Sequence, residues 1–357
     1  MTPSKARALL LVLVLLFVPA RVISSPIEEI PFPLATVAVL GEARFTADTE
    51  DLKVLHADPI LRRYRSLLAG LLAQHRLEPL KALLQLGGLV SRGDHSLQWA
   101  VLRDEFFERL RRQGIATILL PGEHERRSRG TFLFSKDLEL EELERTLGAA
   151  FPVYTYPGVS VALRHGFQEL AGLVLIFLNS TLPVAEQVKY LDLMHERYPG
   201  RGKLVFTHQL PFPLAGNRYG HYFRAPPALS AWAPRLAAWN LLAVFSADRR
   251  VQARFRFSTL PTWFLAAGPL DGLPAAPLEA EVLRKQLRWY LRRTELGPPG
   301  LELDYKVAAT GCGYVLRLFT DRVEVLPLLP EGGTPADPDR RGVLTLPMTV
   351  PRSDSGA

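Results

Sequence analysis

The stretch Ile115–Glu125, IATILLPGEHE, is an apolar run that stops at Pro121-Gly122 and is followed at once by three ionisable residues. Such a run predicts a buried strand that ends in a polar loop. In open α/β sheets, binding and catalytic side chains lie beyond the carboxyl ends of the strands. We therefore predict that Glu123, His124 and Glu125 belong to a functional site, with an ordinary exposed turn as the alternative interpretation.

The same pattern recurs along the chain. Four further apolar runs lead into small or polar residues, and patterns of helical spacing lie between them: 34–40 before Gly41–Arg44, 83–90 before Arg92-Gly93, 203–206 before Thr207–Gln209, and 241–245 before Ser246–Arg250. This alternation favours parallel strands with helical crossovers. We expect the five strand ends to converge on one edge.

The order and spacing of these segments resemble those of the calcineurin-like metallophosphoesterases over residues 34–327. The family motifs are D-x-H, G-D-x-x-x-x-G, G-N-H-E or G-N-H-D, a lone His, and G-H-x-H. The matching text is GGLVSRG for GDLVDRG, LPGEHE for VPGNHE, and LVFTHQLPF for VVFTHHPPF. The resemblance implies an α/β domain in four layers, with two central mixed β-sheets flanked by helices.

An active member of this family holds two metal ions, whose bridging hydroxide attacks phosphorus. Most of the matching positions are substituted in this chain. The residues at the family's site positions, in motif order, are Glu42 for Asp, Arg44 for His, Gly88 for the bridging Asp, Glu123 for Asn, His124 and His208 for themselves, and Asp248 and Arg250 for the last two His. We do not expect a dinuclear centre, because glycine has no donor side chain and arginine is permanently cationic.

Two interpretations of this degraded site stay open. In the first, Arg44 and Arg250 replace the missing cation and either pair with nearby carboxylates such as Glu42 or bind a phosphate group. The protein would then act by binding a phosphate-containing ligand or a protein partner.

In the second interpretation, Glu123, His208 and Asp248 hold a single divalent ion, manganese, iron or zinc, and His124 is the catalytic acid or the phosphate anchor. The chain would then be a mononuclear phosphoesterase that hydrolyses phosphomonoesters or phosphodiesters.

Both ends of the chain differ in composition from the rest. Residues 1–25 have the pattern of a signal peptide or short anchor: Lys5 and Arg7 precede the apolar stretch Ala8–Val18. This stretch is shorter than the roughly 20 residues that span a bilayer. We expect an exported protein, periplasmic or secreted, which contacts a membrane only through this segment. Residues 330–357 are rich in Gly, Pro and Asp, which predicts a disordered tail.

Three further features concern partners and modification. The net charge of +7 comes from basic residues scattered over predicted helices and loops, so no specific nucleic-acid binding is expected. Cys312 is the only cysteine, which excludes an internal disulfide and predicts a small buried side chain. Asn179-Ser180-Thr181 is formally a glycosylation sequon, and the alternative is an asparagine at a strand end.

Overall fold

The chain divides into two compact units, residues 1–32 and 33–357. The predicted signal segment, residues 1–25, lies outside the described residues. Among the helices that are described, none is both long and apolar enough to cross a membrane. The computed structural model describes residues 32–45, 47–128, 138–151, 159–211, 231–247, 252–257, 260–268, 270, 301–304, 312–329 and 343–348.

The first sheet is mixed and has seven strands in the order β14-β13-β12-β1-β2-β3-β4. Four parallel neighbours form one half: β1 (Ala35–Leu40), β2 (Leu80–Gln85), β3 (Ala116–Leu119) and β4 (Val159–Val161). Three antiparallel strands extend the sheet from β1: β12 (Gly313–Leu318), β13 (Arg322–Leu328) and β14 (Leu344–Pro347). The predicted parallel pairing of β2 with β3 is confirmed, and β12 and β13 form an antiparallel hairpin.

The second sheet is also mixed and has seven strands in the order β11-β9-β10-β8-β7-β6-β5. Its parallel strands are β6 (Leu173–Leu178), β7 (Lys203–Thr207), β8 (Leu241–Ala247) and β10 (Trp263–Ala267). Its antiparallel strands are β5 (Gly166–Leu170), β9 (Ala253–Phe257) and β11 (Leu301–Asp304).

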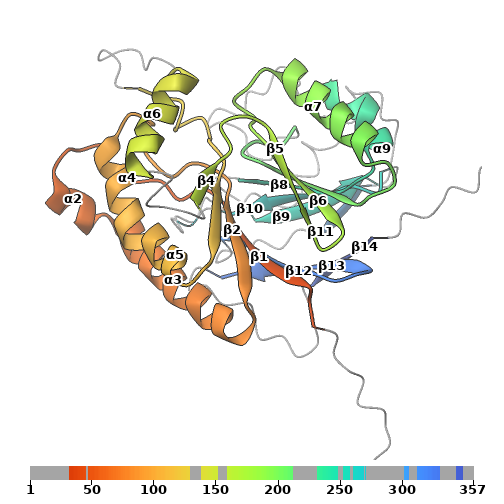
Figure 1. The fold of residues 1–357 in the computed structure, drawn as a ribbon, viewed down its shortest axis with the longest axis horizontal. Helices are drawn as coiled ribbons and strands as arrows, with labels where there is room; N and C mark the ends of the chain where they lie inside the picture. Colours follow the sequence, from red (N-terminus) through yellow and green to blue (C-terminus); the bar gives the residue numbers. More distant parts are fainter. Residues whose placement is uncertain are drawn as a thin grey trace, which may run out of the picture. The chain divides into compact units, whose positions relative to one another are not determined.

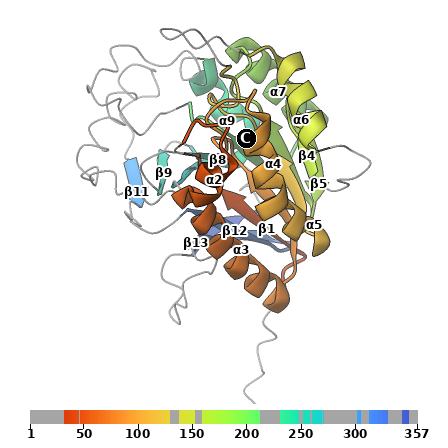
Figure 2. The same ribbon diagram turned by 90° about the vertical axis from the view of Figure 1, so that its left-hand side faces the viewer.

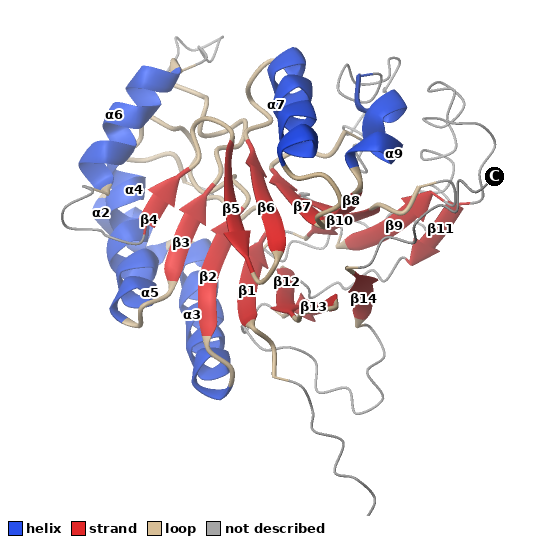
Figure 3. Cartoon of the chain, turned by 45° about the vertical axis from the view of Figure 1, so that its right-hand side comes forward, coloured by secondary structure: helices blue, strands red, loops and turns tan. Residues whose placement is uncertain are grey.

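Helices cover the outer face of each sheet (Figure 1, Figure 2 and Figure 3). Those on the first sheet are α2 (Leu52–Ala57), α3 (Pro59–Leu77), α4 (Ser96–Leu102), a π-helical segment (Arg103–Phe107), α5 (Glu108–Arg112) and α6 (Leu140–Ala150). Those on the second sheet are α7 (Val184–Arg197), a short 3₁₀ helix (Ala233–Arg235) and α9 (Leu236–Trp239).

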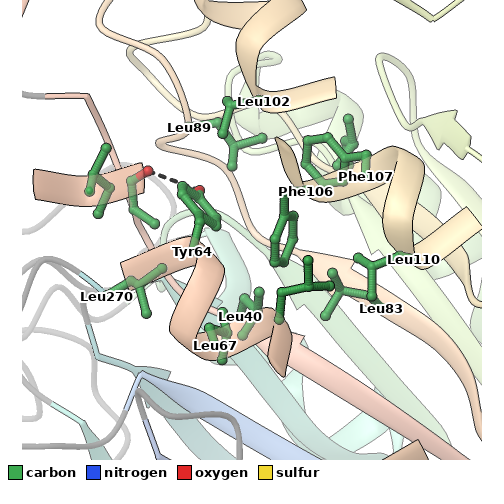
Figure 4. Close-up of a cluster of buried hydrophobic side chains, with 14 of the residues drawn as sticks. Leu40, Tyr64, Leu67, Leu83, Leu89, Leu102, Phe106, Phe107, Leu110 and Leu270 are labelled. Carbon is green, nitrogen blue, oxygen red and sulfur yellow. Dashed lines mark hydrogen bonds between the residues drawn. The ribbon is translucent and has the colours of Figure 1, made fainter. Parts of the chain in front are cut away.

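Three apolar cores hold these layers together. The first lies between the helices and the first sheet and includes Tyr64 and Phe106, whose rings are 4.8 Å apart (Figure 4). The second lies between the two sheets, where Phe206 and Phe245 stack at 5.1 Å. The third lies under α7 and α9 and includes Trp239. A helix–sheet–sheet–helix arrangement follows, which confirms the predicted four-layer sandwich.

Two segments differ from the sequence prediction. The strand expected at residues 83–90 is β2, which begins at Leu80 and ends at Gln85. It ends there because Gly87 and Gly88 have φ values of +90° and +69°, which a strand cannot accommodate. Within residues 330–357, predicted as a disordered tail, Leu344–Pro347 form β14, since Leu346 is buried between the sheets.

Candidate functional site

The loops that follow β1, β2 and β3 meet at the carboxyl edge of the first sheet. The amide of Ala43, in the loop after β1, donates to the carbonyl of Gly88 at 2.9 Å. The amide of Leu120, in the loop after β3, donates to the carbonyl of Gln85 at 2.8 Å. Backbone hydrogen bonds thus fix the three loops to one another. Side chains from segments far apart in the sequence therefore meet here.

Glu42 and Gly88 are in direct contact at the centre of these loops. A Cβ atom added to Gly88 would lie 2.2 Å from Cγ of Glu42 and 2.8 Å from its Cδ. Glu42 is buried, with 6% of its surface exposed. Its side chain thus fills the space in front of Gly88, and the φ of +69° at Gly88 also disfavours any other residue there.

Arg44 lies against the ring of His124. One terminal nitrogen of its guanidinium is 2.5 Å from Nε2 and 3.0 Å from Nδ1 of the imidazole. Burial of His124, followed by the charges of Arg44 and Arg127, lowers the pKa of His124 from its usual value to about 4. At neutral pH the imidazole is therefore uncharged, and it accepts a hydrogen bond from the arginine.

Glu123 lies at the rim of the same cluster. Its carboxylate is 3.3 Å from Nε2 of His124 and 3.4 Å from Nη2 of Arg127. The side chains of Glu123 and Arg127 are 37% and 41% exposed, so water screens this pair and its contribution to stability is small. The predicted residues Glu42, Arg44, Glu123 and His124 thus belong to one cluster that joins two loops.

Glu125 has a role that sequence reasoning missed. Its buried carboxylate accepts hydrogen bonds from four backbone amides, those of Gly88 (2.9 Å), Leu89 (2.6 Å), Val90 (3.2 Å) and Gly122 (2.8 Å). It thereby ties the loop after β2 to the loop after β3. One feature of the sequence pointed to this role: Glu125 comes directly after a buried strand and lies close to glycine-rich loops. A carboxylate that is buried there requires several hydrogen-bond partners.

His208 approaches the cluster from the second sheet, where it follows β7. Its Nδ1 is 2.6 Å from the carbonyl oxygen of Leu86. Since a carbonyl only accepts, Nδ1 is the donor in this hydrogen bond. The ring packs against Gly122, where an added Cβ would lie within 2.7 Å of three ring atoms. Gly122 thus leaves room for a histidine that comes from the other sheet.

Two residues of the predicted site, Asp248 and Arg250, lie outside the described residues. The single-metal ligand set of Glu123, His208 and Asp248 and the pairing of Arg250 therefore stay predictions. Within the described part of the chain, no group of three or more His, Cys, Asp or Glu side chains is arranged to hold a metal ion.

The two other predicted features are described. Asn179 of the sequon is fully buried, and its Nδ2 donates to the carbonyl of Leu163 at 2.7 Å. In the folded protein it is an asparagine at the end of β6 that is inaccessible to a glycosylating enzyme. Cys312 is buried as well.

Two phosphatases are among the solved structures that match this arrangement of sheets. A dimetal phosphatase from Danio rerio matches with a TM-score of 0.50 and 10% identity, over 88% of this chain and 99% of that chain. The chain has the metallophosphoesterase fold. A purple acid phosphatase, PPD1, from yellow lupin seeds matches this metallophosphoesterase fold with a TM-score of 0.55 and 12% identity, over 88% of this chain and 55% of that chain. At the level of sequence, no family model and no curated protein matches the chain.

Proposed function

We propose that this chain is an exported protein of metallophosphoesterase fold that has lost dinuclear catalysis and acts by binding. The ligand we propose is a phosphate-containing molecule, free or carried by a protein partner, held at the Arg44–His124 cluster. Export rests on the signal-peptide pattern of residues 1–25.

The observation that carries this proposal is the contact between Glu42 and Gly88. A dinuclear centre needs a bridging carboxylate at the position of Gly88, and an added Cβ would lie 2.2 Å from Cγ of Glu42. The glutamate therefore leaves no space for that ligand. The residues that the structure describes do not fit a dinuclear centre, so we derive no hydrolytic step that depends on one.

A fixed cation beside a neutral imidazole supports anion binding. Arg44 is partly exposed, and its guanidinium carries several N–H donors in one plane that suit a phosphate oxygen pair. His124 has a pKa of about 4, so at neutral pH its imidazole is uncharged and is a poor proton donor to a leaving group. The chemistry of these two residues thus favours holding an anion over cleaving it.

Binding and turnover can be measured in the same samples. We would titrate inorganic phosphate and bis(p-nitrophenyl) phosphate into the full chain by calorimetry, with manganese present, and follow nitrophenol release. Arg44→Gln should abolish binding. Arg235→Gln, a partly exposed residue on the outer side of the second sheet, is the matched control and should bind as the wild type does.

Two results would contradict the proposal. Nitrophenol release that requires manganese and disappears in His208→Ala would overturn the proposal and establish the mononuclear phosphoesterase. If Arg44→Gln binds these phosphates as tightly as the wild type does, the ligand site does not lie at this cluster.

A further inference from the structure

The edge of the first sheet opposite the candidate site is both basic and apolar. This edge, which we call the amino edge, comprises Leu34 just before β1, the segment from Leu77 at the end of α3 to Lys81 in β2, and the end of α5 at Arg112. Because β1, β2 and β3 are parallel, their amino ends lie together, away from the carboxyl-edge loops. Figure 1 and Figure 3 show the end of α3 beside the starts of β1 and β2.

Two leucines at the amino edge are largely in solvent. Leu77 is 85% exposed at the last residue of α3, and Leu34 is 55% exposed just before β1. A hydrogen bond from Thr36 to Glu78 joins the two segments that carry these leucines. Both apolar side chains therefore project from neighbouring parts of one edge.

Basic side chains lie on the same edge as these leucines. Arg76 and Lys81 are exposed, and within the described part of the chain neither forms an ion pair. Arg112, at the end of α5, is 69% exposed and pairs with Glu108 at 2.9 Å, so the unpaired positive charge of the edge comes from Arg76 and Lys81. Arg317 is bound to Glu78 at 2.7 Å, so this acidic residue of the edge is already neutralised. The amino edge therefore combines positive charge with apolar side chains.

We propose that the amino edge rests on the surface of an anionic lipid bilayer. Exposed leucines that enter the headgroup region, together with lysine and arginine that attract anionic lipids, are the two components of interfacial membrane binding. The sequence outside the described region supports a bilayer as the partner of this edge. Residues 1–31 contain the apolar stretch Ala8–Val18, and this segment continues into the domain at Phe32, close in sequence to Leu34. This orientation would turn the Arg44–His124 cluster toward water, where a soluble ligand can reach it.

A fluorescent probe on the amino edge tests this placement in the full chain. Cys312 is buried, with 1% exposed, so a cysteine introduced on the surface can be labelled selectively with an environment-sensitive dye. We would label Leu77→Cys and, as the matched control, Leu193→Cys, a residue 49% exposed on α7. Vesicles of phosphatidylcholine with and without phosphatidylglycerol would then be added.

The proposal predicts a blue shift at position 77 with phosphatidylglycerol vesicles and none at position 193. In an Arg76→Gln, Lys81→Gln background, the vesicle concentration at half shift should rise about fivefold per charge removed. Equal shifts at both positions, or no shift at position 77, would overturn the proposal. A shift at position 77 that grows with protein concentration without vesicles would also overturn it, by assigning the amino edge to contacts between copies of the chain.

Discussion

Glu42 lies where any side chain at Gly88 would have to lie. The two residues belong to loops that follow neighbouring parallel strands, and an added Cβ at Gly88 would come within 2.2 Å of Cγ of Glu42. The glycine and the glutamate therefore form a matched pair. A side chain at position 88 therefore requires the side chain of Glu42 to move.

Gly88→Asp should destabilise the protein without creating activity. The positive φ costs roughly 1–2 kcal/mol for a residue with a Cβ, and overpacking against Glu42 adds about 1–3 kcal/mol. Chemical denaturation measures this loss. The double variant Gly88→Asp with Glu42→Ala should regain only the stability that is lost through overpacking. A Gly88→Asp variant as stable as the wild type would show that the Glu42 side chain moves aside freely.

Glu125→Ala should release the loop after β2. The substitution leaves four buried amides without an acceptor, and each such group costs about 1–3 kcal/mol. Hydrogen exchange should accelerate at Gly88, Leu89 and Gly122. Glu125→Gln keeps one oxygen and should lie between the wild type and the alanine variant. Unchanged exchange at these amides in Glu125→Ala would contradict the role of this carboxylate.

Arg44→Ala should raise the pKa of His124 above its value of about 4. Burial is the largest cause of the low value and remains, so the pKa should stay below 6.5. Arg127→Ala is the control and should produce a smaller rise, since Arg127 contributes less. An NMR titration of the imidazole measures all three values. A larger rise in Arg127→Ala than in Arg44→Ala would argue against the contact between Arg44 and His124.

Lys203 should make stability depend on pH in the alkaline range. It is fully buried at the start of β7, with Nζ 3.1 Å from the carbonyl of Arg201, and burial lowers its pKa from 10.5 to about 8. The unfolded chain therefore binds this proton more tightly than the folded chain. The free energy of unfolding should rise as pH increases from about 8 to 10.5, and the full penalty, on the order of 3 kcal/mol, applies below pH 8.

Lys203→Met should remove this penalty. The variant should be more stable than the wild type at pH 7, and the alkaline rise in stability should disappear from its profile. Lys189→Met, at an exposed position on α7, is the matched control and should keep the wild-type profile. If the profiles of wild type and Lys203→Met coincide, the lysine is not held in an apolar environment.

The sequence predicts the layers of this fold better than the ends of its strands. The run before Pro121 is mostly apolar, and β3 forms within it. The run at 83–90 is equally apolar, yet Leu86, Leu89 and Val90 are buried in a loop. The hydrophobic residues of a segment indicate that the segment is buried, but they do not tell whether it forms a strand or a loop. Two glycines with positive φ decide where β2 ends.

Prediction from the sequence has a similar limit at the candidate site. The motif positions of Arg44 and His124 could be located in the sequence, and the two side chains are in contact. Glu125 is a predicted site residue, but its hydrogen-bond partners could not be predicted, because the amides of Gly88 and Leu89 are 37 and 36 residues away and their direction depends on the loop conformation. The position of the Glu42 side chain over Gly88 has the same origin, since it follows from the packing of two loops.

The metal content of the purified protein tests the central claim most directly. Elemental analysis of the full chain, purified without chelators and dialysed against manganese, iron and zinc in turn, would count bound ions per chain. Our account predicts no stoichiometric ion, because Glu42 fills the place of the bridging ligand. One or two tightly bound ions per chain, lost in His208→Ala and accompanied by phosphoester hydrolysis, would contradict it.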